Sequence, residues 1–90
     1  MKPILIIEDE HALAAALANA CRRLGFDTKT CSSGKRGLAE AERNDFALTL
    51  LDIGLPDMSG LADLENLLAS FPALPVVIIT AHGNLENAVA

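Results

Sequence analysis

Three short runs of apolar, mostly β-favouring residues recur along the chain, and they limit the folds that it can adopt. They are Ile4 to Ile7, Phe46 to Leu51, where Thr49 is the one polar residue, and Val76 to Ile79. An unbroken apolar run of this length is the pattern of a parallel strand that is covered on both faces. Pro3 fits only at the start of the first run, because proline cannot donate to a sheet ladder. We therefore expect these runs to be strands of a buried parallel sheet.

The segments between these runs have the spacing of amphipathic helices. The first helix is expected from Glu10 to Leu24, ended by Gly25, with an inward stripe of Leu13, Leu17, Ala20 and Leu24. A weaker, peripheral strand is expected over residues 27–31. A second helix should follow from Lys35 to Arg43, with Leu38 and Ala41 inward.

The second half of the chain repeats this order. A loop from Ile53 to Gly60 precedes a helix from Leu61 to Ser70, whose inward residues are expected to be Leu61, Leu64, Leu68 and Phe71. A last helix should open at His82-Gly83-Asn84. Strands and helices thus alternate throughout, which predicts an α/β fold with right-handed crossovers and helices on both faces of the sheet.

Acidic residues follow two of the apolar runs. Glu8 and Asp9 come after the first run, and Asp52 comes after the second. Each alone is an ordinary polar residue at a loop or helix start. If the two strands are neighbours, however, their carboxyl ends open into one crevice, where open α/β sheets bind ligands and where carboxylates attract a hard cation. Together they predict a site.

The charge and the amino terminus exclude some functions. The net charge is −5 with a pI near 4.7, and basic residues cluster no further than the pairs Arg22/Arg23 and Lys35/Arg36, so we expect no nucleic acid to be bound by this segment. The apolar run after Met1 is too short for a signal peptide or a membrane span. A cytoplasmic location without membrane contact is expected.

The cysteines and histidines do not form a metal or redox motif. Cys21 and Cys31 lack the CxxC spacing, so we interpret them as reduced, packed thiols. His11 and His82 lack metal-ligand spacing, which disfavours zinc. Magnesium suits the carboxylates better.

Four ordered motifs at strand ends resemble the receiver domains of two-component response regulators, which have a CheY-like, flavodoxin-like fold. The motifs are Glu8-Asp9, Leu51-Asp52, Leu55-Pro56-Asp57-Met58-Ser59-Gly60 and Thr80-Ala81. The resemblance spans the whole chain and implies one receiver domain over residues 1–90. It also implies the strand order 2-1-3-4 in a three-layer αβα arrangement.

The resemblance implies a role for each site residue. Asp52 would accept a phosphoryl group from a sensor histidine kinase, and Mg²⁺ would be bound by Asp9, Asp52, the backbone carbonyl of Gly54 and, through water, Glu8. The hydroxyl of Thr80 would bond to the phosphoryl group and act as the switch. Such a domain phosphorylates and dephosphorylates itself but is not an enzyme that turns over a metabolite.

The family also implies a fifth strand, preceded by a lysine, and a fifth helix, which this chain lacks. Lys2, Lys29 and Lys35 lie at the wrong positions for that lysine. We expect the chain to be a fragment of a longer regulator, with a natural truncated variant as the alternative. The apolar strand from Val76 to Ile79 would then be an exposed edge, which favours self-association.

The output and the partner are less constrained. The stretch Ile79 to Gly83 is similar to receivers of transcription regulators of the nitrogen-regulation type. Kinase recognition is expected on the exposed face of the first helix, at Ala14, Ala18, Asn19 and Arg22. Two other functions stay open. One is a pseudo-receiver that only binds proteins. The other is a haloacid-dehalogenase-like phosphatase, which is disfavoured because Gly54 stands where that family has a second Asp.

Overall fold

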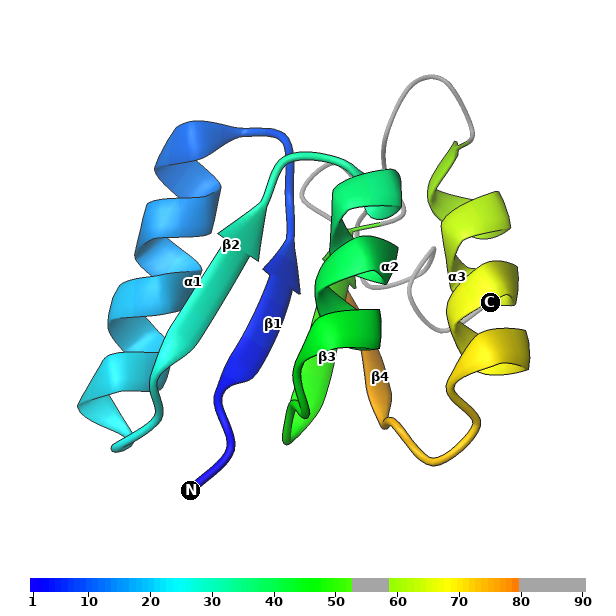
Figure 1. Cartoon of the computed structure of the whole chain (residues 1–90). Coiled ribbons are helices and arrows are strands. Elements are labelled where there is room, and N and C mark those ends of the chain that lie inside the picture. The colour runs from blue at the N-terminus through cyan, green and yellow to red at the C-terminus, as the bar shows by residue number, and fades with distance from the viewer. Residues whose placement is uncertain (53–58, 80–90) are drawn as a thin grey trace.

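Four parallel strands form a single sheet in the order β2-β1-β3-β4 (Figure 1). The computed structural model describes residues 1–52 and 59–79, with the backbone alone for residues 59–64. The elements are β1 (Ile4–Ile7), α1 (His11–Arg23), β2 (Thr28–Cys31), α2 (Gly34–Arg43), β3 (Leu48–Asp52), α3 (Ser59–Ser70) and β4 (Val76–Ile79). The predicted fold and strand order are confirmed.

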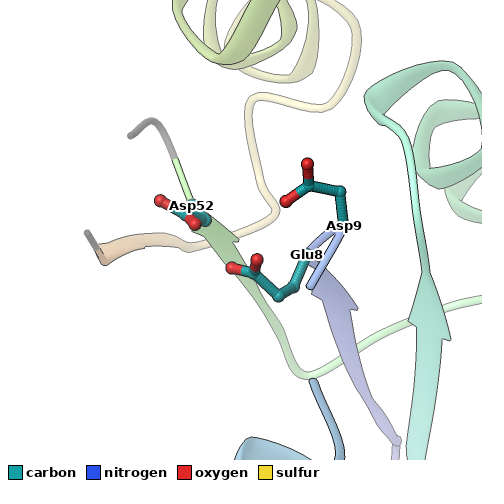
Figure 2. A group of neighbouring side chains, drawn as sticks. All are labelled: Glu8, Asp9 and Asp52. Carbon is teal, nitrogen blue, oxygen red and sulfur yellow. The ribbon is translucent and has the colours of Figure 1, made fainter. Parts of the chain in front are cut away.

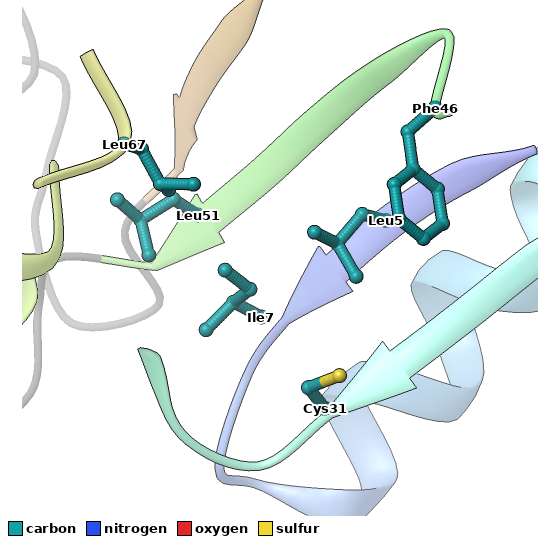
Figure 3. Close-up of a cluster of buried hydrophobic side chains, with 6 residues drawn as sticks. All are labelled: Leu5, Ile7, Cys31, Phe46, Leu51 and Leu67. Atoms are coloured by element: carbon teal, nitrogen blue, oxygen red, sulfur yellow. The ribbon is translucent and has the colours of Figure 1, made fainter. Parts of the chain in front are cut away.

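Helices cover both faces of this sheet, which gives the predicted three layers (Figure 1). On one face, Ile4 and Ile6 of β1 pack against Ala18 and Cys21 of α1. On the other face, α2 and α3 cover a cluster of buried side chains, Leu5, Ile7, Cys31, Phe46, Leu51 and Leu67 (Figure 3). All four residues of β1 are buried, because successive side chains enter opposite layers.

The inward stripe predicted for α1 is partly wrong. Leu13 and Leu17 are half-buried, but the fully buried residues of this helix are Ala14, Ala18 and Cys21, and Ala20 is exposed. Small side chains at the contact let α1 pack close to the sheet. The prediction instead takes the largest apolar residues of the helix, the leucines, as the buried ones. Leu24 lies beyond the end of the helix and is 76% exposed, because the chain turns away at Gly25, whose φ is +94°.

The stripe predicted for α3 also needs correction. Leu67 has no exposed surface, while Leu68 is 52% exposed. Phe71 packs against the core as predicted, and Leu61 and Leu64 lie outside the side chains that the structure describes. Adjacent leucines occupy neighbouring angles around a helix, so the pattern alone did not decide which of the pair faces the sheet.

The two cysteines are free and buried, as predicted. Cys21 of α1 packs against the face of the sheet that α1 covers. Cys31 of β2 packs in the cluster on the opposite face, which α2 and α3 cover. Burial raises the pKa of the Cys31 thiol, which keeps it in the unreactive protonated form. Both side chains therefore act as small apolar packing groups.

Thr49 contributes a polar group to the core. Its side chain is completely buried, and its hydroxyl has no hydrogen-bond partner among the described residues. We expect Thr49→Val, which keeps the shape, to raise the free energy of unfolding by about 1 kcal/mol, because it removes an unsatisfied buried hydroxyl. Urea denaturation measures the change, with the exposed Thr30→Val as control. A less stable Thr49→Val variant would show that the hydroxyl has a partner.

Some predictions fall on residues outside the described ranges. They are the loop over residues 53–58, the helix expected after residue 82, and the site residues Gly54 and Thr80. Among the described helices, none combines the length and the apolar character that crossing a bilayer requires.

Candidate functional site

The register of the sheet brings the two acidic strand ends together. Ile7 of β1 pairs with Leu51 of β3, so Glu8 and Asp52 are the next residues on adjacent parallel strands. Figure 2 shows the carboxyl groups of Glu8 and Asp9 extending from the end of β1 toward Asp52 at the end of β3. This is the carboxyl edge of the sheet, beside the point where the chain order reverses between β1 and β3.

The three carboxyl groups can share one ligand. Glu8, Asp9 and Asp52 each offer an oxygen atom, and these oxygens all lie within 4.8 Å of one another. Glu8 is 4% exposed and Asp52 is 1% exposed, whereas Asp9 is exposed to solvent. The cluster thus has two buried acids and one that faces water, which gives an ion a path to the site.

The environment of Glu8 is unfavourable for its charge. The pKa of Glu8 is raised from 4.5 to about 7, mainly because the carboxyl is buried and to a smaller extent because the Asp52 carboxyl lies beside it. The backbone N–H of Glu10 opposes this by donating to Glu8 Oε1 at 3.0 Å. The other oxygen, Oε2, is buried and has no hydrogen-bond partner among the described residues.

These features fit a divalent cation. An unpartnered buried oxygen and three converging carboxylates need a positive charge or protons to compensate them. Mg²⁺ prefers oxygen ligands and is commonly bound through one or two carboxylates together with water. Asp9 and Asp52 would hold it, with Glu8 near enough to act through a water, and the ion would supply positive charge beside Asp52.

The structure tests part of the predicted site. Glu8, Asp9 and Asp52 are brought together as predicted, while Gly54 and Thr80 lie outside the described residues. Sequence reasoning missed the contribution of Glu10, whose backbone N–H holds Glu8. No signal in the sequence could have found it, because any residue except proline supplies that N–H.

The predicted kinase-facing surface of α1 is wrong at two of its four positions. Ala14 and Ala18 are buried against the sheet and offer no surface to a partner. Asn19 and Arg22 are exposed, and the guanidinium of Arg22 donates to the side-chain oxygen of Asn19. This error has the same cause as the wrong inward stripe of α1. Because the prediction places the leucines inward, the face expected to be exposed is rotated around the helix axis onto Ala14 and Ala18.

A protein-family model agrees with this geometry. The model for the response regulator receiver domain matches residues 4–90 of the chain. Among curated proteins, the probable transcriptional regulatory protein TcrX of Mycobacterium tuberculosis is 37% identical over 97% of the chain, and the match covers 37% of TcrX. For the transcriptional regulatory protein ZraR of Escherichia coli the identity is 33%, and the match covers 20% of ZraR. The chain thus spans less than two fifths of these relatives.

Solved structures show the same fold. A CheY-like receiver domain protein from Methanospirillum hungatei is 32% identical to the chain, with a TM-score of 0.84 over 99% of the chain and 71% of that protein. A chain in the complex of the histidine kinase ThkA with the response regulator TrrA, a Thermotoga maritima protein, matches with 25% identity and a TM-score of 0.83. That match covers 94% of this chain and 73% of the other.

Proposed function

This chain belongs to the response regulator receiver domain family, and from this membership we propose that Asp52 accepts a phosphoryl group from a sensor histidine kinase with the help of Mg²⁺. The observation that supports the proposal most is the convergence of the Glu8, Asp9 and Asp52 carboxyl oxygens within 4.8 Å of one another. The neighbour crystallised with a histidine kinase supports a kinase as the donor.

The proposed reaction uses Asp52 as a nucleophile. A carboxylate oxygen of Asp52 attacks the phosphorus of a phosphohistidine, an acyl phosphate bond forms, and the bond from phosphorus to the histidine nitrogen breaks, with the electron pair returning to that nitrogen. Asp9 and Asp52 would hold the Mg²⁺, whose positive charge would offset the repulsion between the phosphoryl oxygens and the carboxylates. Water returns the aspartate by hydrolysis, so the domain modifies itself and is not an enzyme acting on a metabolite.

The remaining parts of the proposal concern signalling. The backbone carbonyl of Gly54 completes the Mg²⁺ ligands, and the hydroxyl of Thr80 donates to the phosphoryl group and so couples phosphorylation to the output. The curated relatives TcrX and ZraR are named as transcriptional regulatory proteins. We therefore assign the chain to the cytoplasm as the input part of a transcription regulator.

The intact mass of the chain after incubation with a small phosphodonor and Mg²⁺ tests the phosphoacceptor. We expect one added phosphoryl group in the wild type and none in Asp52→Asn or in the presence of EDTA. Asp45→Asn, which removes an exposed acid outside the cluster, is the matched control and should react as the wild type does.

The pseudo-receiver is the competing function, and the same experiment separates the two. No adduct in the wild type, together with no Mg²⁺ binding by calorimetry, would support a domain that acts only through protein contacts. An adduct that persists in Asp52→Asn would place the phosphoacceptor at another residue. Binding of Mg²⁺ without an adduct would call for phosphotransfer from a kinase as the next test.

Self-association through β4 is also part of the proposal. Among the described strands β4 pairs only with β3, and Val77 and Ile78 are each 45% exposed. Such an apolar edge is a template for pairing with another chain. Sedimentation velocity should show a concentration-dependent dimer that is weakened in Val77→Lys, and a monomer at all concentrations would contradict this.

A further inference from the structure

The open edge of the sheet at β2 lies far from β4 in the strand order, and it has a different character. Among the described strands, β2 pairs only with β1 (Figure 1). The carbonyls of Asp27 and Cys31 accept hydrogen bonds from the N–H groups of Ile4 and Glu8. Because successive peptide groups of a strand point to opposite edges, the N–H groups of Thr28 and Thr30 face away from the sheet.

Hollows flank this edge on both faces of the sheet. On the α2 side, a hollow of about 370 Å³ is lined by the bases Lys29, Arg36 and Arg43 and by the acids Glu8 and Glu40, and it reaches His11 and Ala14 of α1. On the α1 side, a second hollow of about 380 Å³ has a floor of small residues, Ala14, Ala15 and Ala18, and is also lined by Thr28 and Thr30 and by the longer side chains His11 and Arg22. An added strand would direct alternate side chains into these two hollows.

The charges select an acidic occupant. Six of the seven lysines and arginines lie between residues 22 and 43 with only three acids, whereas the rest of the chain carries one base and nine acids. Of these bases, Lys29, Arg36 and Arg43 line the α2-side hollow and Arg22 lines the α1-side hollow, against the acids Glu8 and Glu40, so this edge is net basic on an acidic protein. It attracts a negatively charged segment that the remaining surface repels.

One contact in the α2-side hollow competes with such a partner. Lys29 Nζ lies 3.5 Å from Glu40 Oε1, with the lysine side chain 54% exposed. Glu40 also accepts a hydrogen bond from the side-chain amide of Asn44. A carboxylate on an added strand can take the place of Glu40 beside Lys29, and it meets Arg36 and Arg43 in the same hollow.

We propose that the open edge of β2 docks an extended acidic segment of a partner protein, which adds to the sheet as a further strand. The acidic side chains of the segment lie on the α2 side, beside Lys29, Arg36 and Arg43. Its alternate side chains are small and apolar and fill the hollow beside Ala14 and Ala18 on the α1 side. Glu8 lines the α2-side hollow, but Asp9 and Asp52 line neither hollow, and docking requires neither Mg²⁺ nor phosphorylation.

A synthetic peptide of about eight residues that alternates glutamate and valine tests this proposal. Its control has the same composition with all glutamates before all valines, so that only the alternation differs. We expect the alternating peptide to bind at least about fivefold more tightly by fluorescence anisotropy. We also expect the amide NMR signals of Thr28 and Thr30 to shift more than those of β4. Equal binding of the two peptides would overturn strand addition.

Four substitutions sharpen the test, all measured without Mg²⁺. Arg36→Glu should weaken binding roughly fivefold, while Lys35→Glu, the same charge change one residue away and outside the hollow, should have less than about half that effect. Glu40→Gln should strengthen binding, because it releases Lys29. Thr30→Pro should abolish binding by removing an outward N–H, at a strand edge where proline is tolerated.

Two further results would overturn the proposal. If Arg36→Glu and Lys35→Glu weaken peptide binding equally, the overall charge of the protein would explain the loss, and no specific contact in the hollow would be needed. A dimer in sedimentation that Thr30→Pro dissociates, while Val77→Lys leaves it intact, would make the occupant of this edge a second copy of the chain. If Thr30→Pro loses the circular dichroism spectrum of the wild type, Arg36→Glu and Lys35→Glu still decide, because both side chains are exposed.

Discussion

Gly37→Ala should lower the free energy of unfolding by about 2 kcal/mol, although alanine is the better helix former. Gly37 lies in α2 against β1, where an added Cβ would meet Ile7 Cδ1 and would lie 2.7 Å from Ile7 Cγ1. Ile7 is 1% exposed and cannot move aside into solvent. The gain of about 1 kcal/mol in helix propensity is therefore smaller than the cost of overpacking. Urea denaturation with a constant m-value measures the net effect.

A double-mutant cycle shows whether Ile7 is the cause. Ile7→Val removes the nearest methyl group, so Gly37→Ala should cost less in that background than in the wild type. Gly25→Ala is the matched control, since a Cβ there meets nothing within 4 Å and its cost comes from φ of +94°. The loss of unfolding free energy caused by Gly25→Ala should therefore be the same in the wild type and in the Ile7→Val background. Additivity for Gly37 as well would reject the close approach as the explanation.

Without a divalent cation, the protein should lose stability as the pH rises from about 5 to about 8. The pKa of Glu8 is raised by burial from 4.5 to about 7 in the folded state. The folded state therefore binds a proton that the unfolded state releases in this window, so the stabilisation is present below the unfolded pKa and is lost as the pH rises through about 7. The loss is roughly 2–3 kcal/mol, measured by urea denaturation in EDTA.

Glu8→Gln is the control, because the amide keeps an acceptor for the N–H of Glu10 and carries no charge. Its stability should change less than that of the wild type between pH 5 and pH 8, and at pH 8 in EDTA it should be the more stable protein. Adding Mg²⁺ should reverse this order, since the ion binds ionised carboxylates and stabilises the wild type more. Parallel pH profiles for the two proteins would show that Glu8 is not the titrating group.

The sequence by itself determined the class of fold and the location of the site. An unbroken apolar run such as Ile4–Ile7 favours cover on both faces, so alternation with helices leaves few arrangements besides a parallel sheet. Glu8, Asp9 and Asp52 could be assigned to one edge because parallel strands end on the same side. These inferences need only the local pattern of apolar and acidic residues, which is read from the sequence, and the general geometry of parallel strands.

Only the tertiary structure decided which residues meet and what their surroundings do. The rotation of α1 placed Ala14 and Ala18 against the sheet and left Leu24 in solvent, because close packing favours small side chains at the contact. Helix propensity alone treats Gly37 as a residue that weakens α2, yet its missing Cβ lets α2 reach Ile7. The raised pKa of Glu8 likewise depends on burial and on the neighbouring Asp52, which belong to the packing of segments distant in the sequence.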